Sequence, residues 1–200
     1  NNYNFNAEVN HANLKVLNFV KNDSMSLFKG RVAMNMKGTT LDNAYGTIDF
    51  QNTLYTNEYD AYYFKDFSIA SNFNNNERTL SVNSPEIIEG TMKGDFKLNE
   101  VAKLVENSLG NLYTNYRPYA IANDQYIAFN FKVYNKIAEV FYPGLHIGRN
   151  TFFKGSIGSN AKAFNLVFKS PEISIDEHHA TKIELRLDNN NVLYNTYFQI

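Results

Sequence analysis

The fold class is decided by the stretch FKGRVAMNMK at residues 28–37, in which apolar and polar residues alternate. Successive side chains of a β-strand point to opposite faces of the sheet, so alternation with a period of two is typical of a strand. The apolar side chains of this stretch then lie on one face, and its two lysines and its arginine lie on the other. This is the pattern of a strand with one apolar side.

The same alternation returns in both halves of the chain, between turns rich in Gly and Asn such as Asn74-Asn75-Asn76. Gly and Asn tolerate the positive φ angles of tight turns, which explains why they separate the runs. Pattern counting predicts about ten short strands. The following residues are expected to share the apolar face: Phe28, Val32, Met34, Met36, Ile48, Phe50, Ile69, Val82, Met92, Phe96, Phe129, Phe131, Ile157, Leu166 and Phe168.

Composition agrees with a folded, strand-rich chain. Of the 200 residues, 44% are hydrophobic and 20% are charged, which indicates a globular protein rather than a disordered one. The aromatic residues are all Tyr and Phe, which favour strands. A net charge of −1 without a basic cluster argues against a nucleic-acid partner. Without cysteine the chain has neither a disulfide nor a thiolate metal site.

Helical spacing interrupts the strands in the segment from Asn99 to Leu112, where apolar residues recur every three or four positions. Asn99 suits the N-cap of such a helix. Shorter helices are predicted at Asn13–Phe19 and Lys136–Phe141. We expect these amphipathic helices to cover the ends or edges of a sheet.

An internal match suggests duplication. Ser84-Pro85-Glu86-Ile87 recurs as Ser170-Pro171-Glu172-Ile173, and Ser68–Asn72 resembles Ser156–Asn160 upstream of it. We therefore expect two related β modules, at residues 1–120 and 121–200, in a fragment of a longer repeat array. The first module would end in the amphipathic helix. Alternation that runs to both termini suggests that the fragment is excised from a larger chain.

Little in the sequence indicates a catalytic site. His178 and His179 have carboxylates nearby, but neighbours in a strand point to opposite faces and do not easily share a metal ion. Neither a nucleophile elbow nor a phosphate-binding loop occurs. We expect no enzyme activity, no metal and no cofactor. The aromatic run from Tyr55 to Phe64 either stacks on sugars or lies at a lipid boundary, or else forms cross-strand pairs.

Two folds account for the apolar faces. A two-sheet β-sandwich buries them against each other, whereas an elongated, curved single sheet presents them as one concave surface. Alternation in the sequence does not distinguish these folds.

Several motifs resemble the TamB family of Bacteroidota, which are large AsmA-like proteins of the cell envelope. Residues 37–48, KGTTLDNAYGTI, are similar to the strand-turn-strand motif G-x-x-L-D-N-x-x-G of that family. The resemblance continues through residues 78–84, residues 90–96 and the amphipathic stretch that ends near Tyr116–Tyr119. It covers most of the chain and includes no catalytic motif.

The resemblance implies a taco-shaped sheet whose groove is lined by the fifteen apolar residues named above. Such grooves form periplasmic bridges that carry phospholipid acyl chains between the inner and outer membranes, together with a BamA/TamA-type barrel and the rest of the full-length chain. Each CH₂ of an acyl chain that is buried in a dry groove would be stabilised by about 0.8 kcal/mol relative to water. The alternatives are a scaffold that pairs strands with the barrel, or a carbohydrate-binding β module.

Overall fold

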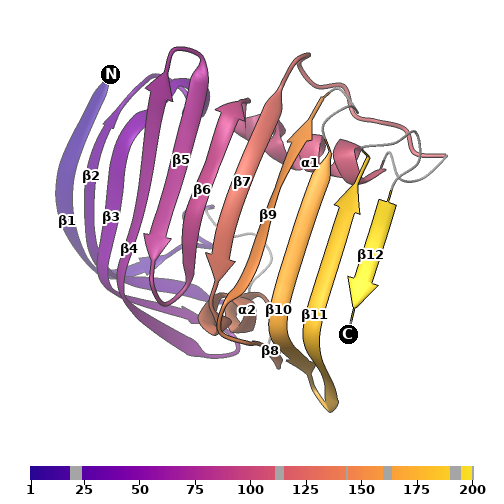
Figure 1. Ribbon diagram of the computed structural model, residues 1–200. Coiled ribbons are helices and arrows are strands. Elements are labelled where there is room, and N and C mark those ends of the chain that lie inside the picture. The colour runs from indigo at the N-terminus through magenta and orange to yellow at the C-terminus, as the bar shows by residue number, and fades with distance from the viewer. Residues whose placement is uncertain (19–23, 111–114, 143, 160–163, 190–194, 200) are drawn as a thin grey trace.

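The computed structural model describes residues 1–18, 24–110, 115–142, 144–159, 164–189 and 195–199. These residues form one open antiparallel sheet, with its strands side by side almost in chain order (Figure 1). Only β8 leaves this order, because it pairs with the far end of β10 beyond β9. The strands are β1 (Asn2–Asn13), β2 (Ser26–Lys37), β3 (Tyr45–Asn57), β4 (Ala61–Asn74), β5 (Glu77–Ser84), β6 (Ile88–Asp95), β7 (Tyr126–Val133), β8 (Leu145–Ile147), β9 (Thr151–Gly158), β10 (Asn165–Ile175), β11 (His178–Asp188) and β12 (Asn195–Gln199).

The predicted mostly-β class with a single curved sheet and short helices is confirmed. Within the described ranges no second sheet packs on the first, so the two-sheet sandwich is not the fold of this part of the chain. Several strands are longer than the short ones expected, with 12 residues in β1 and 14 in β4.

The predicted helix at residues 99–112 is confirmed as α1 (Val101–Gly110), which follows the 3-10 turn η2 (Leu98–Glu100). Its expected last two residues lie outside the described residues. The helix at residues 136–141 is confirmed as α2 (Asn135–Phe141). A further 3-10 turn, η1 (Leu41–Asn43), lies between β2 and β3.

The short helix predicted from Asn13 is wrong over the described residues. The Oδ1 atom of Asn13 accepts hydrogen bonds from the backbone N–H groups of Lys15 and Val16, each at 3.1 Å, which closes a turn at the end of β1. Asn18 then takes a φ of 62°, which ends the single helical turn. Phe19 lies outside the described residues.

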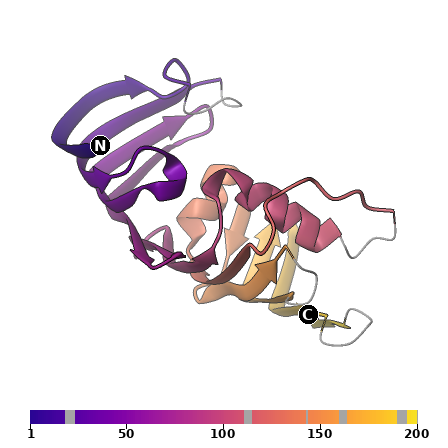
Figure 2. The ribbon, with the colours of Figure 1, turned by 90° about the horizontal axis from the view of Figure 1, so that it is seen from above.

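The sheet is strongly curved. Seen from above, β1–β4 turn away from the plane of the later strands, and η1 and α1 lie on the inner side of the curve (Figure 2). The register of β2 against β3 shifts between Lys29 and Arg31, and Asn52 of β3 has a φ of 49°. An extra residue in one strand bends it and increases its twist, which accounts for part of this curvature.

Cross-strand register places the apolar residues in rows that run across the sheet. One row passes through the paired residues of ten neighbouring strands and is interrupted only by a glycine. Its members, in strand order, are Phe5, Met34, Ile48, Ile69, Val82, Gly90, Phe131, Phe153, Phe168 and Leu185.

The boundary expected near residue 120 falls between α1 and β7. Across it, β6 and β7 pair from Ile88↔Val133 to Asp95↔Tyr126, so the sheet continues without a break. The division into two modules remains a prediction.

The duplication likewise remains a prediction. Ser84 and Ser170 of the matching tetrapeptides are both buried on the apolar side of the sheet. The upstream match is paired differently: Ser68 lies opposite Asn83, whereas Ser156 lies opposite Asn165.

Candidate functional site

The fifteen residues predicted to share an apolar face do lie on one side of the sheet. Register places fourteen of them there, and Phe96, which follows β6, is buried in the core cluster with Ile127 and Ile157. The helices α1 and α2 lie on the same side. Phe96, Phe131 and Ile157 are buried, and the other twelve are only partly buried. Among the described residues, only the two helices and the loop at residues 38–44 lie over this side, and no second sheet does, so much of it is open surface. We call it the groove.

One border of the groove is formed by the loop at residues 38–44, which includes η1, and by η2. The backbone N–H of Leu98 donates to Oδ1 of Asp42 at 2.8 Å, which ties the two segments together. The Arg78 guanidinium lies beneath them and donates to the carbonyl oxygens of Leu41 and Ala44, at 2.7 and 2.6 Å. Arg78 is 1% exposed, and burial lowers its pKa although nearby Asp42 opposes this effect.

The opposite border is formed by α2, which reaches back to the bent ends of β3 and β4. The Tyr62 hydroxyl donates to the carbonyl oxygen of Glu139 at 3.2 Å. The Lys136 ammonium donates to the carbonyl oxygen of Tyr63 at 2.8 Å and pairs with Glu86 at 3.3 Å. The groove therefore runs across the strands, between two borders that cover the strand ends.

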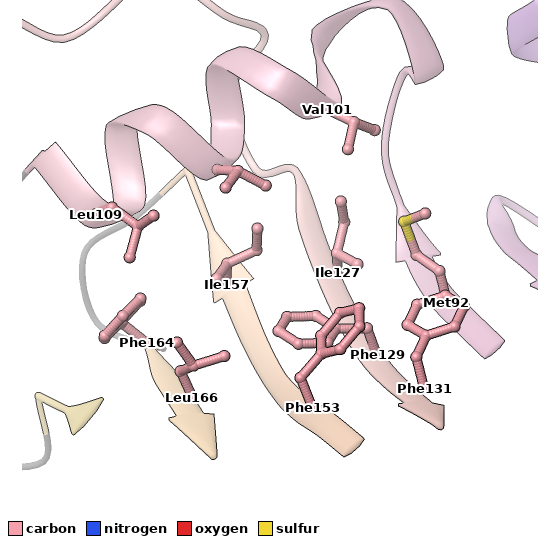
Figure 3. Close-up of a pocket in the computed structure, with 11 residues that line it drawn as sticks. Met92, Val101, Leu109, Ile127, Phe129, Phe131, Phe153, Ile157, Phe164 and Leu166 are labelled. Carbon is pink, nitrogen blue, oxygen red and sulfur yellow. The ribbon is translucent and has the colours of Figure 1, made fainter. Parts of the chain in front are cut away.

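Under α1 the groove becomes a covered pocket (Figure 3) of about 370 Å³. We call it the roofed pocket. The helix lies across the strand ends, with Val101 over the side of Met92 and Leu109 over Phe164. All of the lining side chains are apolar: Met92, Val101, Val105, Leu109, Ile127, Phe129, Phe131, Phe153, Ile157, Phe164 and Leu166.

The roof is anchored on two sides. Leu104 of α1 is fully buried in the core cluster with Phe96, Ile127 and Ile157. The side-chain amide of Asn107 binds the backbone of Tyr119 through two hydrogen bonds. Its Nδ2 donates to the carbonyl oxygen of Tyr119, and its Oδ1 accepts from the Tyr119 N–H at 2.8 Å.

Glu100 fixes the same returning segment close to the start of the helix. Its carboxylate accepts the backbone N–H of Ala122 at 2.9 Å and the side-chain amide of Gln125 at 2.7 Å. These hydrogen bonds, the one from Ala122 first, lower the pKa of the Glu100 carboxyl. Gln125 in turn accepts the N–H of Lys97, so the polar groups around the roof are paired.

Aromatic rings cover two parts of the groove floor. Phe131 and Phe153 stack at 5.3 Å, and Phe129 meets Phe153 at 5.8 Å, both within the roofed pocket. At the other end Phe50 contacts Phe28 and Phe67 edge to face.

Ion pairs lie on the outer face of the sheet. Glu77 pairs with Lys93 at 2.7 Å and accepts the Tyr126 hydroxyl, and these hydrogen bonds lower the pKa of the Glu77 carboxyl. Glu184 pairs with Lys169 at 2.9 Å in the same manner. These two pairs lie on the face opposite the groove, as the alternation predicts, whereas Arg78 and the Lys136–Glu86 pair lie at the borders of the groove.

The other candidate residues do not form a chemical site. His178 and His179 are consecutive residues of β11, opposite Ile175 and Ser174 of β10. Among the described residues, no group of three or more metal-binding side chains comes together.

In the aromatic run, Tyr55 stacks on Tyr62 across β3 and β4 at 6.4 Å, as the cross-strand interpretation predicts. Both rings also line a small cavity against α2. Tyr63 lies on the opposite face, where its hydroxyl donates to Asn52.

Sequence reasoning left several residues out of the groove. Phe153 and Ile127 alternate with their neighbours as clearly as the residues that were chosen, so the signal for them was present. Tyr3 and Phe5 extend the surface onto β1 and are about half exposed. The contribution of α1 had no such signal, because helical spacing does not reveal which surface a helix covers.

Comparison with protein-family models, with curated proteins and with solved structures finds no match to this chain. No helix within the described ranges is long and apolar enough to cross a membrane. The resemblance noted in the sequence stays a prediction.

Proposed function

We propose that this chain binds the acyl chains of phospholipids in the groove, without catalysing a reaction. It would serve as a segment of a TamB-like periplasmic bridge that carries lipid between the inner and outer membranes. The rest of such a protein, and a BamA/TamA-type barrel, would be its partners.

One observation carries this proposal: the apolar row from Phe5 to Leu185 includes no charged residue and lies on a face that no second sheet covers among the described residues. Exposed apolar surfaces of this extent mark binding sites. Because the row lacks hydrogen-bonding side chains, hydrocarbon suits it better than a polar ligand. Each methylene that leaves water contributes about 0.8 kcal/mol to binding.

The direction of the groove supports transfer rather than storage. The apolar row runs across the strands from β1 to β11, at right angles to the two borders' strand ends. A chain lying in the groove would cross many strands and contact apolar side chains at every step. Movement along it would exchange one such contact for another, which keeps the barrier low.

Native mass spectrometry after expression in a bacterial periplasm, followed by lipid extraction, tests the proposal. We expect copurified phospholipid, and we expect Met34→Glu to remove it from a protein that is still folded by circular dichroism. A compact, lipid-free wild-type protein that also takes up no phospholipid from vesicles would contradict it.

A second candidate is a scaffold for outer-membrane protein assembly, and the edge strand β1 favours it. Twelve residues of β1 present an edge that no other described strand pairs, and they include no Pro or Lys, which commonly protect such edges. Pro in place of Asn4 would weaken strand pairing while leaving the lipid content unchanged. Sensitivity of an assembly assay to this substitution, but not to Met34→Glu, would favour the scaffold.

A further inference from the structure

The roofed pocket differs from the rest of the groove in being covered. Val105 and Leu109 of α1 are 38% and 39% exposed, and they line the pocket together with Phe129 and Ile157 from the sheet. Over β2 and β3 the border loop at residues 38–44 lines a second pocket with Met34 and Ile48, but no α-helix among the described residues crosses the row there. The part of the groove under α1 is therefore spanned by a helix, whereas this part is bordered only by a loop.

The lining of the pocket identifies the chemistry of its occupant. A peptide or a sugar needs hydrogen-bonding partners when it is buried, and none of the eleven lining side chains carries a polar group. A volume of about 370 Å³ is at the small end of ligand pockets, which favours one narrow chain over a fused-ring lipid.

We propose that the roofed pocket is the seat for the end of a single unbranched hydrocarbon chain, and that Val105 and Leu109 set the length and thickness of chain that it accepts. This inference rests on the proposed function, because it assumes that the groove binds lipid chains. It adds a selective position within an otherwise permissive groove.

The anchoring of α1 makes selection possible. The helix is held to the core by Leu104 and to the returning segment by Asn107 and Glu100, so it cannot lift without breaking buried contacts. A fixed roof rejects a wide ligand, whereas a mobile one would adapt to it.

A chain-length series tests this seat. Saturated fatty acids of increasing length, and lysophospholipids with the same chains, are titrated into the protein by calorimetry. We expect affinity to rise roughly fourfold per added methylene until the pocket is filled, and to rise less steeply for each further methylene, which lies outside the pocket. The chain length at which this slope changes is the limiting chain length. The same limiting chain length for both series supports a seat for the hydrocarbon alone, whereas a limit that depends on the headgroup overturns it.

Variants of the roof give the decisive comparison. Leu109→Phe should shorten the limiting chain length, and Leu109→Ala should admit methyl-branched chains that the wild type rejects. Ala128→Phe enlarges an exposed side chain of β7 on the opposite face of the sheet and should leave the limit unchanged. Val105→Phe repeats the test from the neighbouring turn of the helix.

The outcomes separate this inference from the proposed function. Affinity that rises with the same slope at every chain length in the wild type overturns the seat while lipid binding stands. A limiting chain length that Leu109→Phe and Val105→Phe do not move does the same. Wild-type protein that binds neither series overturns both.

Discussion

Phe131 of β7 stacks on Phe153 of β9, with ring centroids 5.3 Å apart and ring planes 28° apart. Both rings line the roofed pocket, and Phe131 is 8% exposed. Phe131 is therefore both a buried residue of the sheet and part of the floor of the proposed lipid site. Stability and binding overlap here, but they separate towards β1, where the groove residues are only partly buried.

Replacing Phe131 by Ala should lower the free energy of unfolding by roughly 3 kcal/mol, because it removes a buried ring and the stacking contact of that ring with Phe153. Met34→Ala, in the same row but only partly buried, should cost roughly 1 kcal/mol. Urea denaturation of the two variants measures the difference. Equal losses would mean that the uncovered part of the groove is as well packed as the roofed pocket.

Met34→Glu should remove bound lipid with little loss of stability. The Met34 side chain is partly exposed, so a carboxylate at this position stays hydrated. A hydrocarbon chain that contacted it would have to displace this hydration, which is unfavourable. Asn35→Glu is the matched control, since it adds the same charge one residue along on the opposite, exposed face. Lipid extraction and thermal unfolding of both variants check this. Equal lipid loss in the two would point to a long-range charge effect instead of a blocked groove.

Strand positions and faces were predictable because they depend on local alternation. Residues 28–37 and 126–133 form strands with the expected faces, since side-chain direction in a strand has a fixed period. The curvature was not predictable. It depends on a register shift near Lys29 and on the backbone of Asn52, and one irregular residue leaves no distinct mark in an Asn-rich sequence.

The borders of the groove depend on contacts between distant parts of the chain. Both main helices were expected from their spacing, but α2 packs against Tyr62, more than seventy positions away. Whether the apolar face is open depends on whether other strands of the chain pack against it. Alternation within one strand does not show this, so it left the sandwich and the single sheet equally possible. The open face emerges only when every strand is placed in one sheet.

Arg78 should hold the border loop at residues 38–44 in place. Its guanidinium donates to two carbonyl oxygens of that loop and to the Ser71 hydroxyl, and it lies 4.9 Å from the Phe73 ring centroid. Arg78→Met leaves buried carbonyls without donors and should lower the free energy of unfolding by roughly 2 to 4 kcal/mol. Hydrogen exchange should accelerate in residues 39–45 more than in β7.

Arg78→Lys is the control, because it keeps the charge but has a single ammonium group in place of the forked guanidinium. We expect an intermediate loss of stability and partial protection of the loop. Unchanged exchange in Arg78→Met would show that the loop is held by other contacts, such as the hydrogen bond between Asp42 and Leu98.

The attachment of α1 to the returning segment should depend on pH through Glu100. Its carboxylate accepts two hydrogen bonds, and its pKa lies below the ordinary value of 4.5. A carboxyl whose pKa is lower in the folded state stabilises the fold above its unfolded pKa, and this contribution is lost as the pH falls through the folded pKa. The attachment is therefore intact at neutral pH and weakens in acid.

Glu100→Gln isolates this contribution from other carboxylates with lowered pKa values, such as Glu77 and Glu184. The amide does not titrate, so the wild type should be more stable than the variant above about pH 5, and the gap should close as the pH falls further. Urea denaturation of both proteins across this range measures the gap. A gap that is independent of pH would mean that Glu100 acts through its shape and packing, because only the ionised carboxylate can produce a difference that disappears in acid.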